Sequence, residues 1–186
     1  MNFVTFHGMG FNFDEKDTFG PNLTNKLQQF GEVYNCHFDL NNLEYTNWEE
    51  IAKNLIKDNL ITPNTIIFAH SLGTLFAIKF LAKFNLTPKA LISIAGGYHP
   101  QMSLHPLLKT FTPTIIDFDF IKQNVKNKVF IYSNNDRFFD ELMQQNYIKA
   151  GDFKPVFVPN KGHFGRTEKV LDLDEAILEV KNILEL

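Results

Sequence analysis

Residues 65–84 read TIIFAHSLGTLFAIKFLAKF, and this stretch decides the fold. TIIF is short, apolar and rich in β-branched residues, which is typical of a buried strand, whereas TLFAIKFLAKF carries apolar residues at helical spacing. Between them, AHSLG (69–73) places Ser71 in a tight turn. The stretch therefore predicts a strand–turn–helix unit with a lone serine at its turn.

Segments of the same two kinds alternate along the rest of the chain. Strand-like runs lie at 3–6, 33–38, 65–68, 90–95, 129–133 and 155–159, and helical patterns lie at 22–30, 47–59, 71–84, 138–149 and 171–185. Alternating strands and helices imply right-handed crossovers and a parallel sheet with helices on both faces. We expect a three-layer α/β/α sandwich whose six-stranded, mostly parallel sheet has the order 2-1-3-4-5-6.

Residues 97–127 interrupt this alternation, because they are more than a connecting helix needs and include several prolines and a helical pattern near 117–125. Insertions in such sheets lie above the carboxyl ends of the strands, where ligands bind. We therefore expect one domain over 1–186 with a small cap at about 97–127. Its apolar residues, Phe111 above all, are expected to line the substrate pocket and to limit substrate size; an ordinary surface excursion is the alternative.

The composition excludes several classes of protein. The chain has 186 residues, a formal charge of −3 and no run of Lys or Arg, which argues against a nucleic-acid partner. Cys36 is the only cysteine, so neither an intrachain disulfide nor a thiolate metal cluster is expected. No apolar run approaches the ~20 residues of a membrane span. The start, MNFVTFHG, has no basic segment, so we expect no signal peptide and a cytoplasmic location.

The turn at Ser71 fits the nucleophile elbow G-x-S-x-G, with Ala69 at the first glycine position. The elbow needs small residues two before and two after the nucleophile, because the turn is strained and crowded. Ala69 and Gly73 satisfy this need. Ser71 is accordingly the candidate nucleophile, and a structural turn serine is the alternative.

A serine nucleophile needs a base and an acid that orients the base. In hydrolases with this elbow the chain order is Ser, Asp or Glu, then His. Asp136 lies in SNNDRFFD (133–140) and His163 in PNKGHFG (159–165), each just past a predicted strand. The alternatives are an Asx turn or helix cap for Asp136 and a solvated loop residue for His163. Asp140, expected inside the following helix, and Asp152, before its strand, are the rival acids.

The oxyanion of an acyl transfer needs two backbone N–H donors. Leu72 follows the nucleophile at a helix N-terminus, and Met9 lies in HGMG (7–10) after the first strand. We predict that these two amides form the oxyanion hole and that His7 and Gly8 of the same loop contact the substrate. His70 is expected to pack and hydrogen-bond with its side chain turned away from Ser71.

A cofactor is not expected. GMGFNF (8–13) resembles the start of a dinucleotide fingerprint, but Phe13 stands where the third glycine belongs. The histidines are scattered without carboxylates at metal-ligand spacing, so no metal site is expected.

With these pieces placed, the chain resembles the α/β-hydrolase superfamily, and more narrowly the small serine hydrolases of the retinoblastoma-binding protein 9 family. The resemblance runs nearly end to end and rests on FHGMG, NWEEIAKNL, AHSLGT, SNNDRFF and GHFGRTE. Ala69, Arg137, Gly165 and Arg166 depart from the family's usual residues but leave the three catalytic positions intact. The resemblance implies a minimal α/β-hydrolase fold and hydrolysis of carboxylic esters or amides, with aminopeptidase-like activity known in the family.

We therefore predict a serine hydrolase that acts on small esters or amides through Ser71, Asp136 and His163, without a cofactor, nucleic acid or membrane. Two other functions stay open. The first is a protein-interaction module that keeps the fold without catalysis. The second is a thioesterase or acyl transferase, which differs only in the acceptor that the acyl-enzyme meets.

Overall fold

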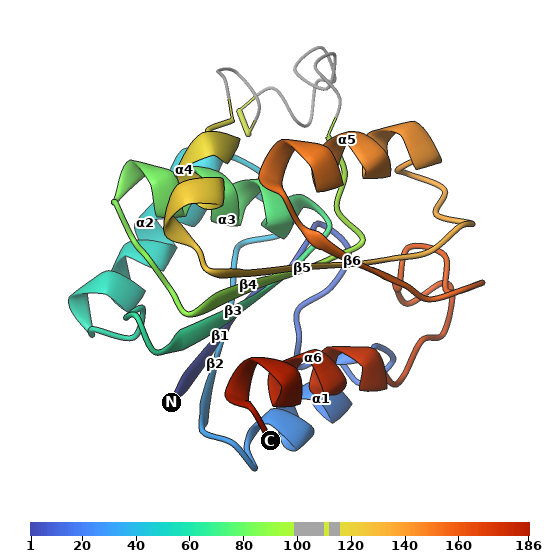
Figure 1. Cartoon of the computed structure of the whole chain (residues 1–186), viewed down its shortest axis with the longest axis horizontal. Coiled ribbons are helices and arrows are strands. Elements are labelled where there is room, and N and C mark those ends of the chain that lie inside the picture. The colour runs from blue at the N-terminus through green and yellow to red at the C-terminus, as the bar shows by residue number, and fades with distance from the viewer. Residues whose placement is uncertain (99–109, 112–115) are drawn as a thin grey trace.

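A six-stranded parallel sheet lies at the centre of the computed structural model, which describes residues 1–98, 110–111 and 116–186 (Figure 1). The strands are β1 (Asn2–Phe6), β2 (Glu32–Cys36), β3 (Thr65–His70), β4 (Ala90–Ile94), β5 (Asn127–Tyr132) and β6 (Lys154–Phe157). Every neighbouring pair is parallel, in the order β2-β1-β3-β4-β5-β6. The predicted sheet and its strand order are confirmed.

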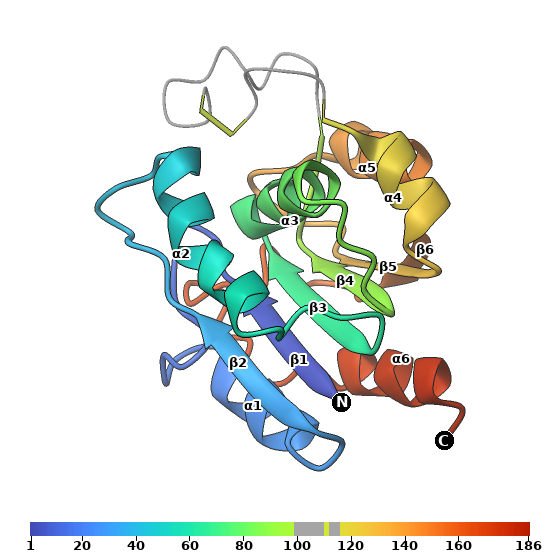
Figure 2. The same cartoon turned by 90° about the vertical axis from the view of Figure 1, so that its left-hand side faces the viewer.

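Helices cover both faces of this sheet (Figures 1 and 2). They are α1 (Gly20–Leu27), α2 (Tyr45–Lys57), α3 (Leu72–Lys83), α4 (Phe118–Asn124), α5 (Glu141–Gly151) and α6 (Asp174–Leu184). α1 and α6 lie side by side on one face, and α2, α3, α4 and α5 lie on the other. The structure thus has the predicted three layers.

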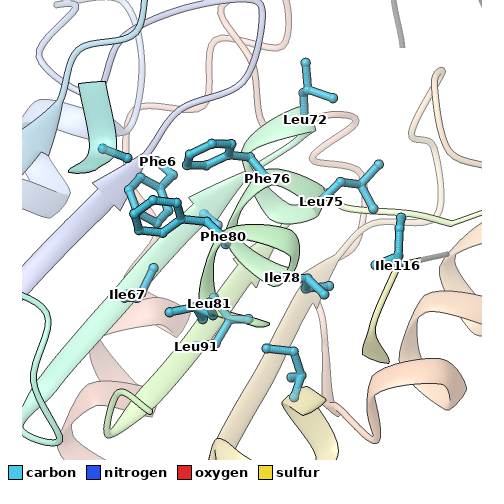
Figure 3. Packing of buried hydrophobic residues seen from close by; sticks show 14 of the residues in the cluster. Phe6, Ile67, Leu72, Leu75, Phe76, Ile78, Phe80, Leu81, Leu91 and Ile116 are labelled. Carbon is cyan, nitrogen blue, oxygen red and sulfur yellow. The ribbon is translucent and has the colours of Figure 1, made fainter. Parts of the chain in front are cut away.

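Two apolar clusters, one on each face, follow from the period of two along the buried strands. In β3, Ile66 and Phe68 pack toward α1 and α6, whereas Ile67 and Ala69 pack toward α3. α3 lies in the middle of its layer, and from Leu72 to Leu81 every residue but Lys79 is buried (Figure 3). A helix that is apolar nearly all round requires cover on several sides, and the sheet, α2 and α4 provide it (Figure 2).

Two helices begin three residues later than the sequence pattern predicts. The predicted helix over 138–149 begins at Glu141, because Asp140 is its N-cap and accepts a hydrogen bond from the Met143 amide at 2.8 Å. The expectation that Asp140 lies inside the helix is therefore wrong. The predicted helix over 171–185 likewise begins only at Asp174.

About half of the expected cap over 97–127, residues 99–109 and 112–115, lies outside the described residues. Its final helical pattern, near 117–125, is confirmed as α4. Among the described residues, each helix is too short or too polar to cross a membrane.

Candidate active site

Three loops at the carboxyl edge of the sheet bring Ser71, Asp136 and His163 together. Ser71 follows β3, Asp136 follows β5, and His163 follows β6. His163 Nε2 lies 2.8 Å from Ser71 Oγ, and His163 Nδ1 lies 2.8 Å from Asp136 Oδ2. A carboxylate only accepts, so Nδ1–H donates to Asp136 and Nε2 of the neutral ring accepts from the serine hydroxyl. The arrangement leaves Ser71 beside a base that is oriented by an acid.

Ser71 has a strained backbone, with φ 54° and ψ −122°, between the end of β3 and the start of α3. Its N–H donates to the Ile94 carbonyl at 3.0 Å, which ties the turn to β4. A Cβ on Gly73 would lie 2.4 Å from the Phe6 carbonyl oxygen, so α3 approaches β1 only because Gly73 has no side chain. The small residues that the elbow pattern requires therefore have a steric reason in this chain.

Gly8, in the loop after β1, lies directly against Ser71. A Cβ on Gly8 would lie 2.7 Å from Ser71 Cβ and 3.2 Å from Ser71 Oγ. The peptide between Gly8 and Met9 consequently runs close to the serine oxygen. A substrate carbonyl at Ser71 would lie beside this backbone, and the substrate contact expected for Gly8 stays a prediction.

The His7 side chain does not reach this space. It is fully buried, its Nδ1–H donates to the Gly8 carbonyl at 2.6 Å, and its Nε2 accepts from the Phe38 amide at 2.8 Å. Burial lowers the pKa of His7 and keeps the ring neutral. The expected contact between His7 and substrate is therefore corrected. Because the carbonyl and N–H of one trans peptide point in opposite directions, His7 instead fixes the direction of the Met9 N–H.

Leu72 is the first residue of α3, and its amide has no acceptor within the helix. The positive end of the helix dipole adds to its attraction for an anion. Met9 is partly buried against the cluster that contains α3. Both predicted oxyanion donors thus lie in the two segments that meet at Ser71, and their role remains a prediction.

The loop that carries His163 is fastened to the loop that carries Asp136 by consecutive hydrogen bonds. We call residues 133–136 the acid loop and residues 160–164 the histidine loop. Besides the Asp136–His163 bond, the pairs are Ser133 Oγ with Lys161 N at 2.9 Å, Asn134 Oδ1 with Asn160 N at 2.9 Å, and Asn135 Oδ1 with Gly162 N at 2.7 Å. Each residue of the acid loop therefore bonds one residue of the histidine loop.

These bonds stabilise a backbone that residues with side chains adopt reluctantly. Asn160, Gly162 and Phe164 all have positive φ, between 54° and 59°. The roles of Ser133, Asn134 and Asn135 were not predicted, because SNN after a strand is also typical of an ordinary polar turn. The signal that was available is the run of four short polar side chains before Arg137.

The rival acids have other roles. Asp140 caps α5, and Asp152 follows α5 with left-handed backbone angles. Asp136 is the one of the three whose carboxylate bonds His163, and its side chain is only 1% exposed. Its Oδ1 also accepts from the Phe138 and Phe139 amides at 2.8 and 3.1 Å, so the Asx turn considered as an alternative is present as well.

The His70 side chain supports the histidine loop through one hydrogen bond. Its ring is buried, and Nε2–H donates to the His163 carbonyl at 2.9 Å. Burial, with the neighbouring His163 as a smaller cause, lowers the pKa of His70 to about 3, so the ring is neutral near neutral pH. The predicted packing and hydrogen-bonding role of His70 is confirmed.

Phe111 does not line an open pocket. Its side chain is fully buried, with its ring 4.9 Å from the Trp48 ring and 6.0 Å from the Tyr45 ring. Lys79 Nζ donates to the Phe111 carbonyl at 2.8 Å and fastens this point to α3. The expectation that Phe111 contacts substrate and limits its size is corrected, because the residue is part of the core.

The sequence matches no protein-family model and no curated protein sequence. Solved structures resemble it at the level of the fold. The ydeN gene product of B. subtilis is 19% identical with a TM-score of 0.83, covering 100% of this chain and 99% of that one. Est1E from Butyrivibrio proteoclasticus, solved with ferulic acid, is 13% identical with a TM-score of 0.71, covering 99% and 88%. MGS-MChE2, described as an alpha/beta hydrolase enzyme from a lagoon-sediment metagenome in Morocco, is 14% identical with a TM-score of 0.70, covering 100% and 92%. The chain therefore has the α/β-hydrolase fold.

Proposed function

We propose that the chain is a serine hydrolase that cleaves carboxylic esters or amides of small molecules. The observation that carries this proposal is the continuous chain of hydrogen bonds from Ser71 Oγ through His163 to Asp136, at a serine with strained backbone angles. Strained residues cluster at functional sites, and a nucleophile bonded to an oriented base is the arrangement that acyl transfer requires. The description of MGS-MChE2 as a hydrolase enzyme agrees with this assignment.

In the proposed reaction, Ser71 Oγ attacks the carbonyl carbon while His163 Nε2 takes the hydroxyl proton. The Leu72 and Met9 amides stabilise the negative charge on the carbonyl oxygen. The tetrahedral adduct collapses to an acyl-enzyme as His163 gives its proton to the leaving alcohol or amine. Water then attacks the acyl carbon and loses a proton to His163, which gives it to Ser71 Oγ as the bond to the acyl carbon breaks and the acid is released. Asp136 orients the ring and stabilises its cation throughout without taking the proton.

We further propose that the chain belongs with the small hydrolases of the retinoblastoma-binding protein 9 family, acts in the cytoplasm and takes a small ester or amide as its partner. The support is the set of motifs around the three catalytic candidates. None of these finer points follows from the fold alone.

The test is Ser71→Ala. Hydrolysis of p-nitrophenyl acetate and labelling by a fluorophosphonate probe should both fall by several orders of magnitude, because the nucleophile is removed. The matched control is Cys36→Ala, which removes the only thiol and should leave both signals intact. A Ser71→Ala protein that folds and keeps more than a few per cent of its activity would overturn the proposal.

A further inference from the structure

Phe138 is a large apolar side chain exposed beside the proposed base. It is 55% exposed, and its ring centroid lies 4.6 Å from that of His163 at an interplanar angle of 67°. Isolated exposed apolar residues are common on protein surfaces. This one is unusual in its place, because it contacts the ring that would exchange protons with a substrate.

The position of the Phe138 ring is fixed from two directions. Its backbone N–H donates to Asp136 Oδ1 at 2.8 Å, and the other oxygen of the same carboxylate bonds His163. The Arg137 guanidinium lies over the Phe138 ring at 4.8 Å and donates to Thr167 Oγ1 at 3.1 Å. One carboxylate therefore bonds both the imidazole and the Phe138 backbone, and the Arg137 guanidinium lies over the Phe138 ring.

The proposed reaction determines which part of a substrate meets this ring. His163 must lie within hydrogen-bond reach of the leaving atom when it returns the proton. The leaving group is consequently the part of the substrate beside the imidazole, whereas the acyl oxygen faces the Leu72 and Met9 amides. Phe138 contacts the imidazole, so it lies on the leaving-group side of the scissile bond.

The charges around Phe138 favour a neutral ligand. The Arg137 guanidinium has the Glu168 carboxylate nearby, with Nε and Oε1 3.8 Å apart, and the Asp136 carboxylate bonds the Phe138 backbone N–H. An anionic leaving group would meet a guanidinium that already has the Glu168 carboxylate beside it, and it would lie near the buried Asp136 carboxylate. A flat apolar group would bury the half-exposed ring at no such cost and would pair with its face.

We propose that Phe138 is a leaving-group subsite and that the enzyme prefers esters or amides whose leaving group carries a neutral aromatic ring. This inference rests on the proposed function, because it uses His163 as the group that protonates the leaving atom. It adds a substrate class to that function.

The experiment compares three small esters. 2-Phenylethyl acetate carries the ring on the leaving group, ethyl phenylacetate carries it on the acyl group, and ethyl acetate carries none. In wild type, kcat/KM for 2-phenylethyl acetate should exceed that for ethyl acetate. Phe138→Ala should lower the ratio of kcat/KM for 2-phenylethyl acetate to that for ethyl acetate by about three- to tenfold, as expected for the loss of an aromatic pair. The ratio of kcat/KM for ethyl phenylacetate to that for ethyl acetate should stay unchanged. Phe157→Ala removes another exposed aromatic residue, on β6, and should change neither ratio.

A second readout does not need catalysis. Binding of the product alcohol, 2-phenylethanol, is measured by saturation-transfer NMR with wild type and Phe138→Ala, and the signal should weaken in the variant. If no ester is hydrolysed but this difference is present, the proposed function fails and the leaving-group assignment fails with it, and Phe138 is only an aromatic-binding surface. If esters are hydrolysed but Phe138→Ala changes neither the leaving-group ratio nor the alcohol signal, the subsite is overturned. An equal fall in the ratio of kcat/KM for ethyl phenylacetate to that for ethyl acetate also overturns the subsite.

Discussion

Ser71 and His163 are positioned by different means, although their side chains share a hydrogen bond. Around Ser71 the means is close packing, because Gly8 and Gly73 leave no room for a further carbon atom and α3 is buried nearly all round. Around the histidine loop the means is hydrogen bonding from the acid loop at a half-exposed edge. A packed site should fail when atoms are added, whereas a hydrogen-bonded one should fail when acceptors are removed.

The largest effect is expected at the bond that joins acid and base. Asp136→Asn should lower kcat by about 10⁴-fold, because an amide facing Nδ1 favours the wrong tautomer of His163. Steady-state kinetics on an activated ester measures it. Asp140→Asn is the control, since asparagine caps a helix as well as aspartate does and kcat should hardly change. Equal losses in the two variants would contradict the assignment.

A smaller but still large effect is expected from adding one carbon to the packed region. Gly73→Ala places a Cβ against two backbone oxygens, those of Phe6 and His7, which cannot move aside as a side chain would. The free energy of unfolding should fall by about 1–3 kcal/mol. Activity should fall about a hundredfold from a displaced Ser71. Both are measured beside Gly10→Ala, where an added Cβ has nothing within 4 Å. Similar behaviour of the two variants would show that packing at the turn is not what positions Ser71.

Removing one acceptor from the hydrogen-bonded region should have a moderate effect. Asn135→Ala removes the acceptor that the Gly162 N–H and the Ser133 hydroxyl share, and kcat should fall about three- to tenfold, as for the loss of the bond between the two loops, with KM unchanged. Asn135→Asp keeps an oxygen in the same place and should recover most of the loss. If aspartate is no better than alanine, the acceptor at position 135 does not position His163.

The smallest effect at neutral pH is expected for His70, which links the two regions. Its pKa is about 3 in the folded protein and about 6.5 in the unfolded chain. Between these values the unfolded chain binds a proton that the folded one does not, so stability falls as pH is lowered from about 6.5 toward 3 and does not change with His70 above that range. His70→Gln keeps an N–H donor for the His163 carbonyl. Its thermal midpoint should depend less steeply on pH than that of wild type in this window, while both show similar activity at pH 7. An equal dependence of the two thermal midpoints on pH would contradict the lowered pKa of His70 as the cause.

The same difference between regions decided what the sequence could predict. The elbow is local, because a strand, a serine between small residues and a helix follow one another within residues 65–84. The meeting of Ser71, Asp136 and His163 follows from the order of the strands that precede them. Phe111 and His7 were misassigned, since whether a ring faces a pocket or the core depends on residues such as Trp48 that are distant in sequence. The role of the acid loop was not predicted for a similar reason, because its side-chain oxygens accept from backbone amides about 27 residues later in the sequence.

The bonds between the two loops are unequal in one respect: at Ser133, Asn134 and Asn135 the acceptors are side chains, whereas at Asn160, Lys161 and Gly162 the donors are backbone amides. The two loops should therefore tolerate substitutions to different extents. At position 161 the bond asks only for an N–H, which every amino acid but proline supplies. At position 135 the hydrogen bond requires an oxygen at the end of a short side chain. Over time the acid loop should keep its residues while position 161 changes freely, although the histidine loop is the one that carries the proposed base.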